Sequence, residues 1–288
     1  MDFRTDLALE RCEFLGKTEI EGVKIEAFRA KKARVSRIEV TNLQGAEAIG
    51  KPIGMYVTVE VAPFAKHAQF IDDSLDALVE EIRLLLPESG SVLVTGLGNT
   101  KITPDALGPK CASMIFATRH ITGELLKQTG LSGLRTVSAF STGVTGDTGA
   151  EAGEILKGIV KTIRPDVVIT IDALAARSAS RLGNTVQMCS SGIVPGSGVG
   201  NARQEISQKT LGVPVIAIGV PTVVDAATLV ADYSAADMLE LPEEAVRMMV
   251  TPREVDLMVE RAAKLTALAI NCALQPDISP EDMLILTA

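Results

Sequence analysis

Three apolar, β-branched segments, the first two of which lead through a polar loop into a helical pattern, are the feature that most restricts this chain. They are Ser91–Gly96 (SVLVTG), Thr136–Ser141 (TVSAFS) and Asp166–Asp172 (DVVITID). Helical patterns follow the first two, at about residues 105–128 and 150–163. Strands that alternate with helices form a parallel sheet, because each helix carries the chain back across the sheet. The sequence therefore predicts an α/β fold with a mostly parallel sheet flanked by helices.

The N-terminal part of the chain has a different pattern. Short strand-like runs with charged turns predict a small antiparallel β unit at about residues 19–62, and the first sixteen residues, which lack a clear period, are interpreted as an arm. Asp72–Leu86 and Pro252–Leu274 have the spacing of helices. No repeat or interdomain linker interrupts the pattern, so we expect a single domain.

Composition and charge exclude several classes of protein. The 288 residues are 47% apolar, which is ample for a core, and their net charge of −8 argues against direct binding to nucleic acid. The most apolar run, Leu211–Val224, is too short to span a membrane and contains two prolines. The first ten residues carry charges where a signal peptide would have an apolar run. We expect a cytoplasmic protein that does not associate with membranes.

Cysteine and histidine give little support to metal or nucleophilic chemistry. The four cysteines are widely separated without a CxxC pair, and the two histidines, His67 and His120, do not form an HExxH motif. Cys189 begins a Cys-Ser-Ser sequence but lacks a nucleophile elbow, so a small buried residue is the better interpretation. We expect no cofactor and no obligatory metal.

Two aspartates follow strand-like segments and are the candidate catalytic groups. Asp105 lies in Thr-Pro-Asp before a helical pattern, where a helix cap is the alternative interpretation. Asp172 ends the apolar run VVITI, where a carboxylate is costly unless it is hydrogen-bonded or used, so a structural buried carboxylate bonded to loop amides or Arg177 is its alternative. In a parallel sheet both would face the carboxyl edge, in loops. Two carboxylates that share a proton can act as base and acid in peptide hydrolysis.

Two glycine-rich loops accompany these aspartates. Gly96 and Gly98 do not complete a dinucleotide fingerprint, because position 101 is Lys101. The second loop, Pro195–Asn201 (PGSGVGN), lacks the lysine and hydroxyl of a phosphate-binding loop. A flexible turn and a backbone cradle for substrate remain equally good interpretations of this loop.

Several blocks in order along the chain together resemble the spore germination protease family. They are RTDLALE (4–10), GAEAIGK (45–51), GLGN (96–99), TPDALGPK (103–110), IDALAARS (171–178), PGSGVGN (195–201), PVIAIGVPTVVDA (214–226) and VTPREVD (250–256). The family comprises endopeptidases that degrade small acid-soluble spore proteins. The resemblance implies a fold related to the hydrogenase-maturation endopeptidases, a homotetramer, and a location in the forespore or spore core.

The same resemblance implies roles for particular residues. Asp105 and Asp172 would be the catalytic pair. The protein would be a self-processing zymogen cut between Asp6 and Leu7, which makes residues 1–6 a short propeptide and residues 7–288 the protease domain. Substrates would be cut after acidic residues, chiefly glutamate. The segment between Asp225 and Val250 is shorter than in familiar members of the family.

Two other functions remain open at this point. One is a metal-linked endopeptidase of the hydrogenase-maturation type, which would depend on a divalent ion. The other is a non-enzymatic α/β module that binds a ligand through its glycine-rich loops.

Overall fold

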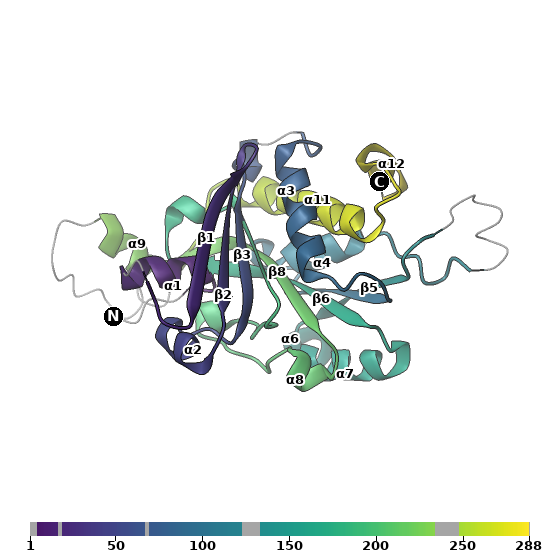
Figure 1. Ribbon diagram of the computed structural model, residues 1–288, viewed down its shortest axis with the longest axis horizontal. Helices are drawn as coiled ribbons and strands as arrows, with labels where there is room; N and C mark the ends of the chain where they lie inside the picture. The colour runs from purple at the N-terminus through teal and green to yellow at the C-terminus, as the bar shows by residue number, and fades with distance from the viewer. Residues whose placement is uncertain (1–4, 17–18, 67–68, 123–132, 234–247, 288) are drawn as a thin grey trace.

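A mixed β-sheet runs through the centre of the protein, with helices on both faces (Figure 1). The computed structural model describes residues 5–16, 19–66, 69–122, 133–233 and 248–287. Within these ranges the sheet has nine strands, in the order β1-β2-β3-β7-β8-β6-β4-β5, and β9 pairs with β8. The α/β prediction is confirmed.

The strands form a parallel part and an antiparallel part. β5 (Val137–Gly143), β4 (Val92–Leu97), β6 (Val167–Ala176) and β8 (Val215–Asp225) are parallel neighbours. The next strand, β7 (Thr185–Cys189), is antiparallel to β8. These pairings make β1, β3, β4, β5, β6 and β8 point in one direction.

The antiparallel unit predicted near the N-terminus is present, and it belongs to the same sheet. It consists of β1 (Val23–Ala30), β2 (Ala33–Val40) and β3 (Gly54–Glu60), and β3 pairs with β7. The two-residue β9 (Met249–Val250) pairs with the far end of β8. One continuous sheet therefore joins residue 23 to residue 250.

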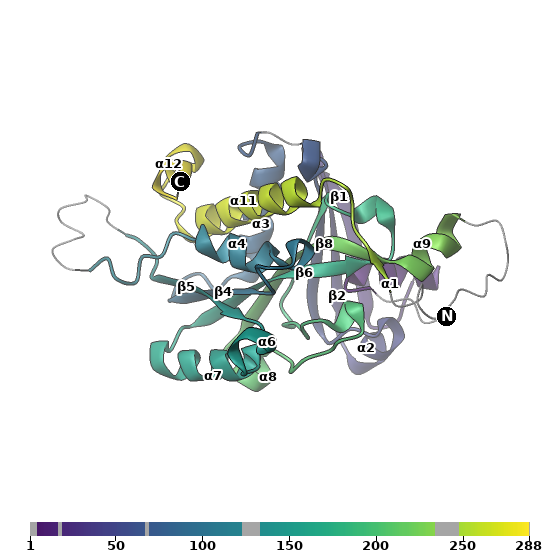
Figure 2. The ribbon, with the colours of Figure 1, turned by 180° about the vertical axis from the view of Figure 1, so that it is seen from behind.

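The main core lies between one face of the sheet and three helices (Figure 2). These are α3 (Asp73–Leu85), α4 (Leu107–Ser113) and α11 (Val255–Leu274), which bury residues such as Leu78, Leu107 and Leu268. The Asp72 carboxylate begins α3 by accepting hydrogen bonds from the amides of Ser74 and Leu75.

The opposite face carries two smaller clusters. α7 (Ala152–Ile163) and α8 (Gln208–Leu211) cover β4, β6 and β8, where Leu156 and Leu211 join Val168 and Val215. α1 (Ala8–Leu15) and α2 (Leu43–Ile49) contribute residues to a cluster with β2 and β3. The remaining elements are η1 (Phe64–Lys66), η2 (Thr103–Asp105), α6 (Thr145–Thr148), η3 (Ala179–Arg181), η4 (Ser197–Val199), α9 (Ala226–Tyr233) and α12 (Pro280–Leu286).

Some element predictions are wrong. The arm predicted at the N-terminus contains α1, whose Ala8, Leu9 and Cys12 are buried against β2 and β3, so tertiary packing supports a helix with a weak sequence period. The helix predicted from Asp105 onward ends at Ser113, and residues 123–128 of that prediction lie outside the described residues. α11 begins at Val255, three residues after Pro252.

None of the helices in the described ranges is long and apolar enough to cross a membrane.

At Gly108, the backbone of α4 approaches the carboxyl ends of β4 and β6 closely. A Cβ atom there would lie 2.2 Å from the Leu97 carbonyl oxygen and 2.3 Å from that of Ile171. Backbone atoms cannot move aside as a flexible side chain can, so we expect Gly108→Ala to lower the free energy of unfolding by about 1–3 kcal/mol. Urea unfolding measures the change.

Gly158→Ala is the matched control. Gly158 lies inside α7 and has open space around its Cβ position. Alanine should stabilise that helix by about 0.5–1 kcal/mol. Equal effects at the two positions would contradict the close-contact interpretation of Gly108.

Candidate functional site

Asp172 lies inside β6, one residue beyond the last residue of β6 that pairs with β4. The β4–β6 pairing ends at Gly96 and Ile171, whereas β6 continues beside β8 as far as Ala176. Asp172 was predicted in a loop, and this is wrong because β6 and β8 extend beyond β4 and keep Asp172 in a ladder with Gly219. Its side chain is 6% exposed, and its carboxylate accepts a hydrogen bond from the Ala173 amide.

Asp105 reaches the same edge of the sheet from η2, which follows β4. Its Oδ2 and its own carbonyl oxygen both accept from the Asn99 amide, at 2.8 and 3.1 Å. Gly98 has φ +113°, and a Cβ there would lie 2.1 Å from the Asp105 carbonyl oxygen. The N-cap residue of α4 is Ala106 and no side chain caps this helix, so the cap interpretation is wrong, whereas the alternative of a first-turn carboxylate holds for η2.

One cavity of about 430 Å³ brings the two aspartates together with Asp6. Its walls come from the segments after β4 and β5, from β6 and from the glycine-rich loop, and they include Leu97, Gly98, Val144, Glu151, Ala173, Pro195, Gly196 and Gly198. A second cavity of about 460 Å³ adjoins it and shares Asp6, Leu174, Ile193 and Val194. Asp6 therefore lies between the two cavities.

Burial acts on both carboxyl groups, and neighbouring negative charge acts on Asp172. The pKa of Asp172 is raised well above its usual value, first by burial and then by the negative charges of Asp105 and Asp6. Burial also raises the pKa of Asp105, but the hydrogen bond from the Asn99 amide opposes it. Asp172 is thus the stronger candidate to hold a proton, and Asp105 the better candidate to be ionised.

The segment Thr5–Leu7 is bound in the site by backbone and side-chain contacts. The Asp6 amide donates to the Ala175 carbonyl oxygen at 3.0 Å, and Oδ2 of Asp6 accepts from the Ala175 amide at 2.8 Å. Its Oδ1 accepts from Ser197 Oγ at 2.9 Å. A Cβ atom on Gly198 would lie 2.1 Å from Oδ2 of Asp6. The Pro195–Asn201 loop thus contacts Asp6 through the Ser197 hydroxyl and leaves space for its carboxylate at Gly198.

The backbone carbonyl of Asp6 faces the second cavity. It accepts hydrogen bonds from Lys51 Nζ and from Gln187 Nε2, each at 2.9 Å. The following amide, that of Leu7, donates to Thr5 Oγ1 at 3.0 Å. Leu7 is fully buried and is the N-cap residue of α1. Both sides of the Asp6–Leu7 peptide bond are therefore held in place.

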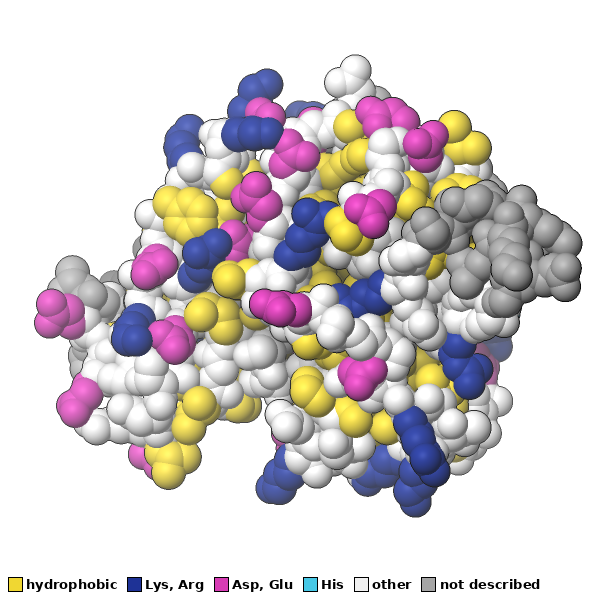
Figure 3. Space-filling model, turned by 45° about the vertical axis from the view of Figure 1, so that its right-hand side comes forward, with side chains coloured by type: hydrophobic (Ala, Val, Ile, Leu, Met, Phe, Trp, Pro, Cys, Tyr) yellow, Lys and Arg dark blue, Asp and Glu magenta, His cyan; other side chains and the backbone are white. Residues whose placement is uncertain are grey.

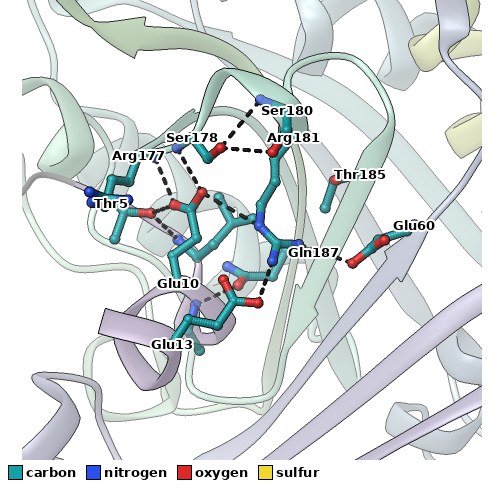
Figure 4. Close-up of polar contacts among 12 residues, drawn as sticks. Thr5, Glu10, Glu13, Glu60, Arg177, Ser178, Ser180, Arg181, Thr185 and Gln187 are labelled. Carbon is teal, nitrogen blue, oxygen red and sulfur yellow. Dashed lines mark hydrogen bonds and ion pairs between the residues drawn. The ribbon is translucent and has the colours of Figure 1, made fainter. Parts of the chain in front are cut away.

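Glu10 fixes this segment to the end of β6 (Figure 4). Its buried carboxylate accepts from the amides of Arg177 and Ser178, at 2.7 and 2.9 Å, and from Thr5 Oγ1. Arg181 lies beside it, with Nε 3.6 Å from Glu10 Oε1. Arg181 also pairs with Glu13 of α1 at 2.6 Å and Glu60 of β3 at 3.1 Å, so it ties α1 to the sheet.

Other residues considered from the sequence lie away from the two aspartates. Cys189 is buried, as predicted, and burial raises its pKa. His120 is exposed in a turn, and His67 lies outside the described residues. Asp225 caps α9 by accepting from the amides of Ala227 and Thr228. Lys110 is exposed on α4.

Lys51, Gln187, Glu10 and Arg181 were not predicted as site residues. Lys51 ends the GAEAIGK block and Glu10 ends RTDLALE, so both blocks contained a signal. Gln187 and Arg181 lie outside these blocks, and only the pairing of β7 with β3 and β8 brings Gln187 to the site.

The described residues offer no cluster of metal-binding groups, and one face of the protein carries mixed charges. No group of three histidine, cysteine or acidic side chains is placed to hold a metal ion in the part of the chain that the structure describes. Figure 3 shows a face on which acidic, basic and apolar side chains are interspersed.

The raised pKa of Asp172 predicts a specific dependence of stability on pH. The folded protein binds this proton more tightly than the unfolded chain, whose carboxyl groups titrate near 3.8. The stabilisation is fully present below that pH and is lost as pH rises through the folded pKa. We expect Asp172→Asn to be more stable than the parent at pH 7.5, with a difference that shrinks toward pH 4.

Asp166→Asn, at the other end of the same strand, should behave in the opposite way. Hydrogen bonds from the Ser91 amide and hydroxyl lower the pKa of Asp166, so its stabilisation is present at neutral pH and is lost in acid. Urea unfolding of the three proteins at several pH values measures both trends. An Asp172→Asn protein that is less stable than the parent at pH 7.5 would contradict the prediction.

Comparison with solved structures gives a weak likeness. The NiFe hydrogenase maturation protease HycI from Thermococcus kodakarensis KOD1 aligns with 65% of this chain and 98% of its own, at 16% identity and a TM-score of 0.34. That score is too low to support an argument about the site.

Comparison of sequences is much more informative. A family model described as germination protease matches residues 6–240. The germination protease of Caldanaerobacter subterraneus subsp. tengcongensis is 40% identical, with 98% of this chain and 97% of the relative covered. Those of Clostridium perfringens and Priestia megaterium are 38% and 36% identical, each over 97% of this chain. The chain therefore belongs to the germination protease family, and it is a protease of spore germination.

Proposed function

We propose that this protein is a self-processing zymogen that cleaves small acid-soluble spore proteins after acidic residues, with Asp105 and Asp172 as its acid/base pair. The observation that carries the proposal is the single cavity lined by Asp105, Asp172 and Asp6. Asp6 precedes the bond expected to be cut on activation. The cavity thus contains two candidate catalytic carboxyls and the acidic residue of a candidate substrate.

The two environments support different roles for the two carboxyls. Asp172 is the more deeply buried, and its raised pKa keeps it protonated, so it acts as the general acid. Asp105 is less buried and accepts from the Asn99 amide, which favours the carboxylate, so it acts as the general base toward water. The charge of Asp105 also raises the pKa of Asp172, which helps to keep the proton there.

The bound N-terminal segment supports the zymogen proposal. Asp6 lines the cavity that contains both aspartates and is anchored by Ala175, Lys51 and Gln187. An external substrate and this segment would compete for the same contacts. Removal of residues 1–6 would therefore open the site.

The contacts of the Asp6 side chain support cleavage after acidic residues. Its Oδ2 accepts from the Ala175 amide and its Oδ1 from the Ser197 hydroxyl. The amide can only donate, so a donor such as a lysine side chain could not replace the acidic group there. Gly198 leaves the space that the carboxylate fills. A substrate with aspartate or glutamate at this position would present the same acceptors.

The proposed substrates fit an acidic enzyme with an open cavity. Small acid-soluble spore proteins coat DNA, and once released they are extended chains that enter a cavity at little cost of unfolding. The net charge of −8 would keep the enzyme from competing for the DNA. We propose a cytoplasmic location in the spore core and assembly as a homotetramer.

A metal-linked endopeptidase and a ligand-binding module are the competing functions. Loss of activity on chelation, restored by one divalent ion, would favour the first. Tight binding of a small molecule without any proteolysis by fresh protein would favour the second.

Replacement of either aspartate should abolish both activities. We expect Asp105→Asn and Asp172→Asn to fold, to keep residues 1–6 and to cleave a glutamate-containing peptide at least about 1,000-fold more slowly than the parent, because the base or the acid is missing. Intact-mass analysis over time at mildly acidic and neutral pH follows self-processing, and chromatography follows the peptide.

Asp166→Asn is the control, since Asp166 lies at the opposite end of β6 and is exposed there. It should retain both activities. Near-normal cleavage by both Asp105→Asn and Asp172→Asn would refute the aspartate pair, whereas loss of activity in Asp166→Asn would point to a general defect.

Gly198→Ala tests the carboxylate cradle. The added methyl group would overlap the position of Asp6 Oδ2, so we expect self-processing and cleavage after glutamate to slow by about 10-fold or more. Gly146→Ala, with open space at its Cβ position, should leave both rates unchanged. Unchanged rates in Gly198→Ala would mean that the acidic side chain binds elsewhere.

A further inference from the structure

The Asp6 carbonyl oxygen is held by two side chains from the antiparallel part of the sheet. Lys51 lies between α2 and β3, and Gln187 is the middle residue of β7. Their nitrogens approach this oxygen at 2.9 Å each. The two aspartates approach the same segment from the parallel part, after β4 and in β6. Donors and carboxyl groups thus reach one peptide unit from different parts of the sheet.

The orientation of the Gln187 amide is fixed by a second contact. Its Oε1 accepts from the Ala8 amide at 2.8 Å, so the NH₂ group is the part that faces the Asp6 carbonyl. Gln187 is buried in β7, and strand pairing with Thr58 and Gly219 holds its backbone. This donor is preorganised, which is the property that an oxyanion-binding group requires.

Lys51 is suited to the same task. It lines the 460 Å³ cavity with Asp6, Gln187 and Cys189. Burial lowers the pKa of its ammonium group, and the charge of Asp6 is the largest opposing influence. A cation in a partly desolvated site interacts strongly with negative charge that develops nearby. Lys51 donates a hydrogen bond to the Asp6 carbonyl oxygen, which becomes negatively charged when water attacks the peptide.

We propose that Lys51 and Gln187 form the oxyanion-binding pair of this protease, for its own Asp6–Leu7 bond and for external substrates. This inference rests on the proposed function, because it assumes that Asp6–Leu7 is a scissile bond. It adds two catalytic residues to the aspartate pair.

In the reaction, separate groups act as the general base, as the general acid and as the donors to the oxyanion. Asp105 takes a proton from water as the water oxygen bonds to the carbonyl carbon, and the carbonyl oxygen becomes an oxyanion held by Lys51 and Gln187. When the oxyanion reforms the carbonyl, the C–N bond breaks and Asp172 gives its proton to the leaving nitrogen. The new carboxylic acid gives its proton to the released amine, which becomes an ammonium group, and the proton on Asp105 passes to Asp172 to restore the pair.

The test uses the full chain with single replacements that remove each donor. We expect Lys51→Met and Gln187→Met each to lower kcat for a peptide with a single glutamate by about 100- to 1,000-fold, with KM changed by less than about fivefold. Self-processing should slow in parallel. Lys51→Arg keeps a charged donor and should recover part of the loss. Lys161→Met on α7 and Gln44→Met on α2 replace exposed residues of the same types and should match the parent.

A purely structural role for these residues predicts the opposite change in the rate of peptide cleavage. If Lys51 and Gln187 only hold the N-terminal segment in the cavity, their loss would release the segment and increase peptide cleavage. Parent-like or higher kcat in both methionine variants would therefore overturn the inference. Thermal unfolding checks that each variant folds, and if Lys51→Met does not, Gln187→Met and Lys51→Arg decide.

The same set of variants separates this inference from the proposed function. If the parent is active, the Asp105→Asn and Asp172→Asn variants are inactive and the methionine variants are active, only the oxyanion-pair proposal is refuted. If the parent protein neither processes itself nor cleaves the peptide, both proposals are refuted. Loss of activity in the aspartate and methionine variants, with active controls, supports both.

Discussion

The buried carboxyl of Asp172 is the constraint on which the site depends. The pairing of β4 with β6 ends at Gly96 while β6 and β8 continue, so Asp172 remains in a strand but has no β4 partner on one side. The segment from Gly98 to Asp105 fills that side and brings a second carboxyl to the gap. A protonated Asp172 costs less to bury than a charged one, and this is why the pair can exist inside a well-packed sheet.

The N-terminal segment completes the structure around this gap. Glu10 would be an expensive charge to bury, but two backbone amides, a hydroxyl and the nearby Arg181 compensate it. Because Glu10 lies on α1, these bonds position Thr5–Leu7 beside Ala175. The helix that the sequence period did not reveal is therefore held by long-range contacts and by its packing on β2 and β3.

The parallel part of the fold was predictable from the sequence because its strands are apolar runs with helical patterns between them. That the two aspartates lie at one edge was predictable for a related reason, since residues that follow neighbouring parallel strands meet there. The position of Asp172 inside β6 was not, because β6 and β8 extend beyond their pairing with β4. Lys51, Gln187 and Arg181 could not be found this way. They reach the site only because β3 pairs with β7 and β7 with β8, and antiparallel pairing between strands about 130 residues apart leaves no local pattern.

The charges at the site also suggest how the proposed cleavage would become irreversible. Asp6 already contributes negative charge that raises the pKa of Asp172. Hydrolysis of Asp6–Leu7 would add an α-carboxylate at the same residue, in place of a neutral carbonyl, and an ammonium group at Leu7 that must leave its fully buried position. Repulsion between the new carboxylate and the aspartate pair, together with solvation of the new ammonium group, would drive the two ends apart. Each external product cut after an acidic residue would carry the same extra charge, so the feature that opens the zymogen would also assist product release.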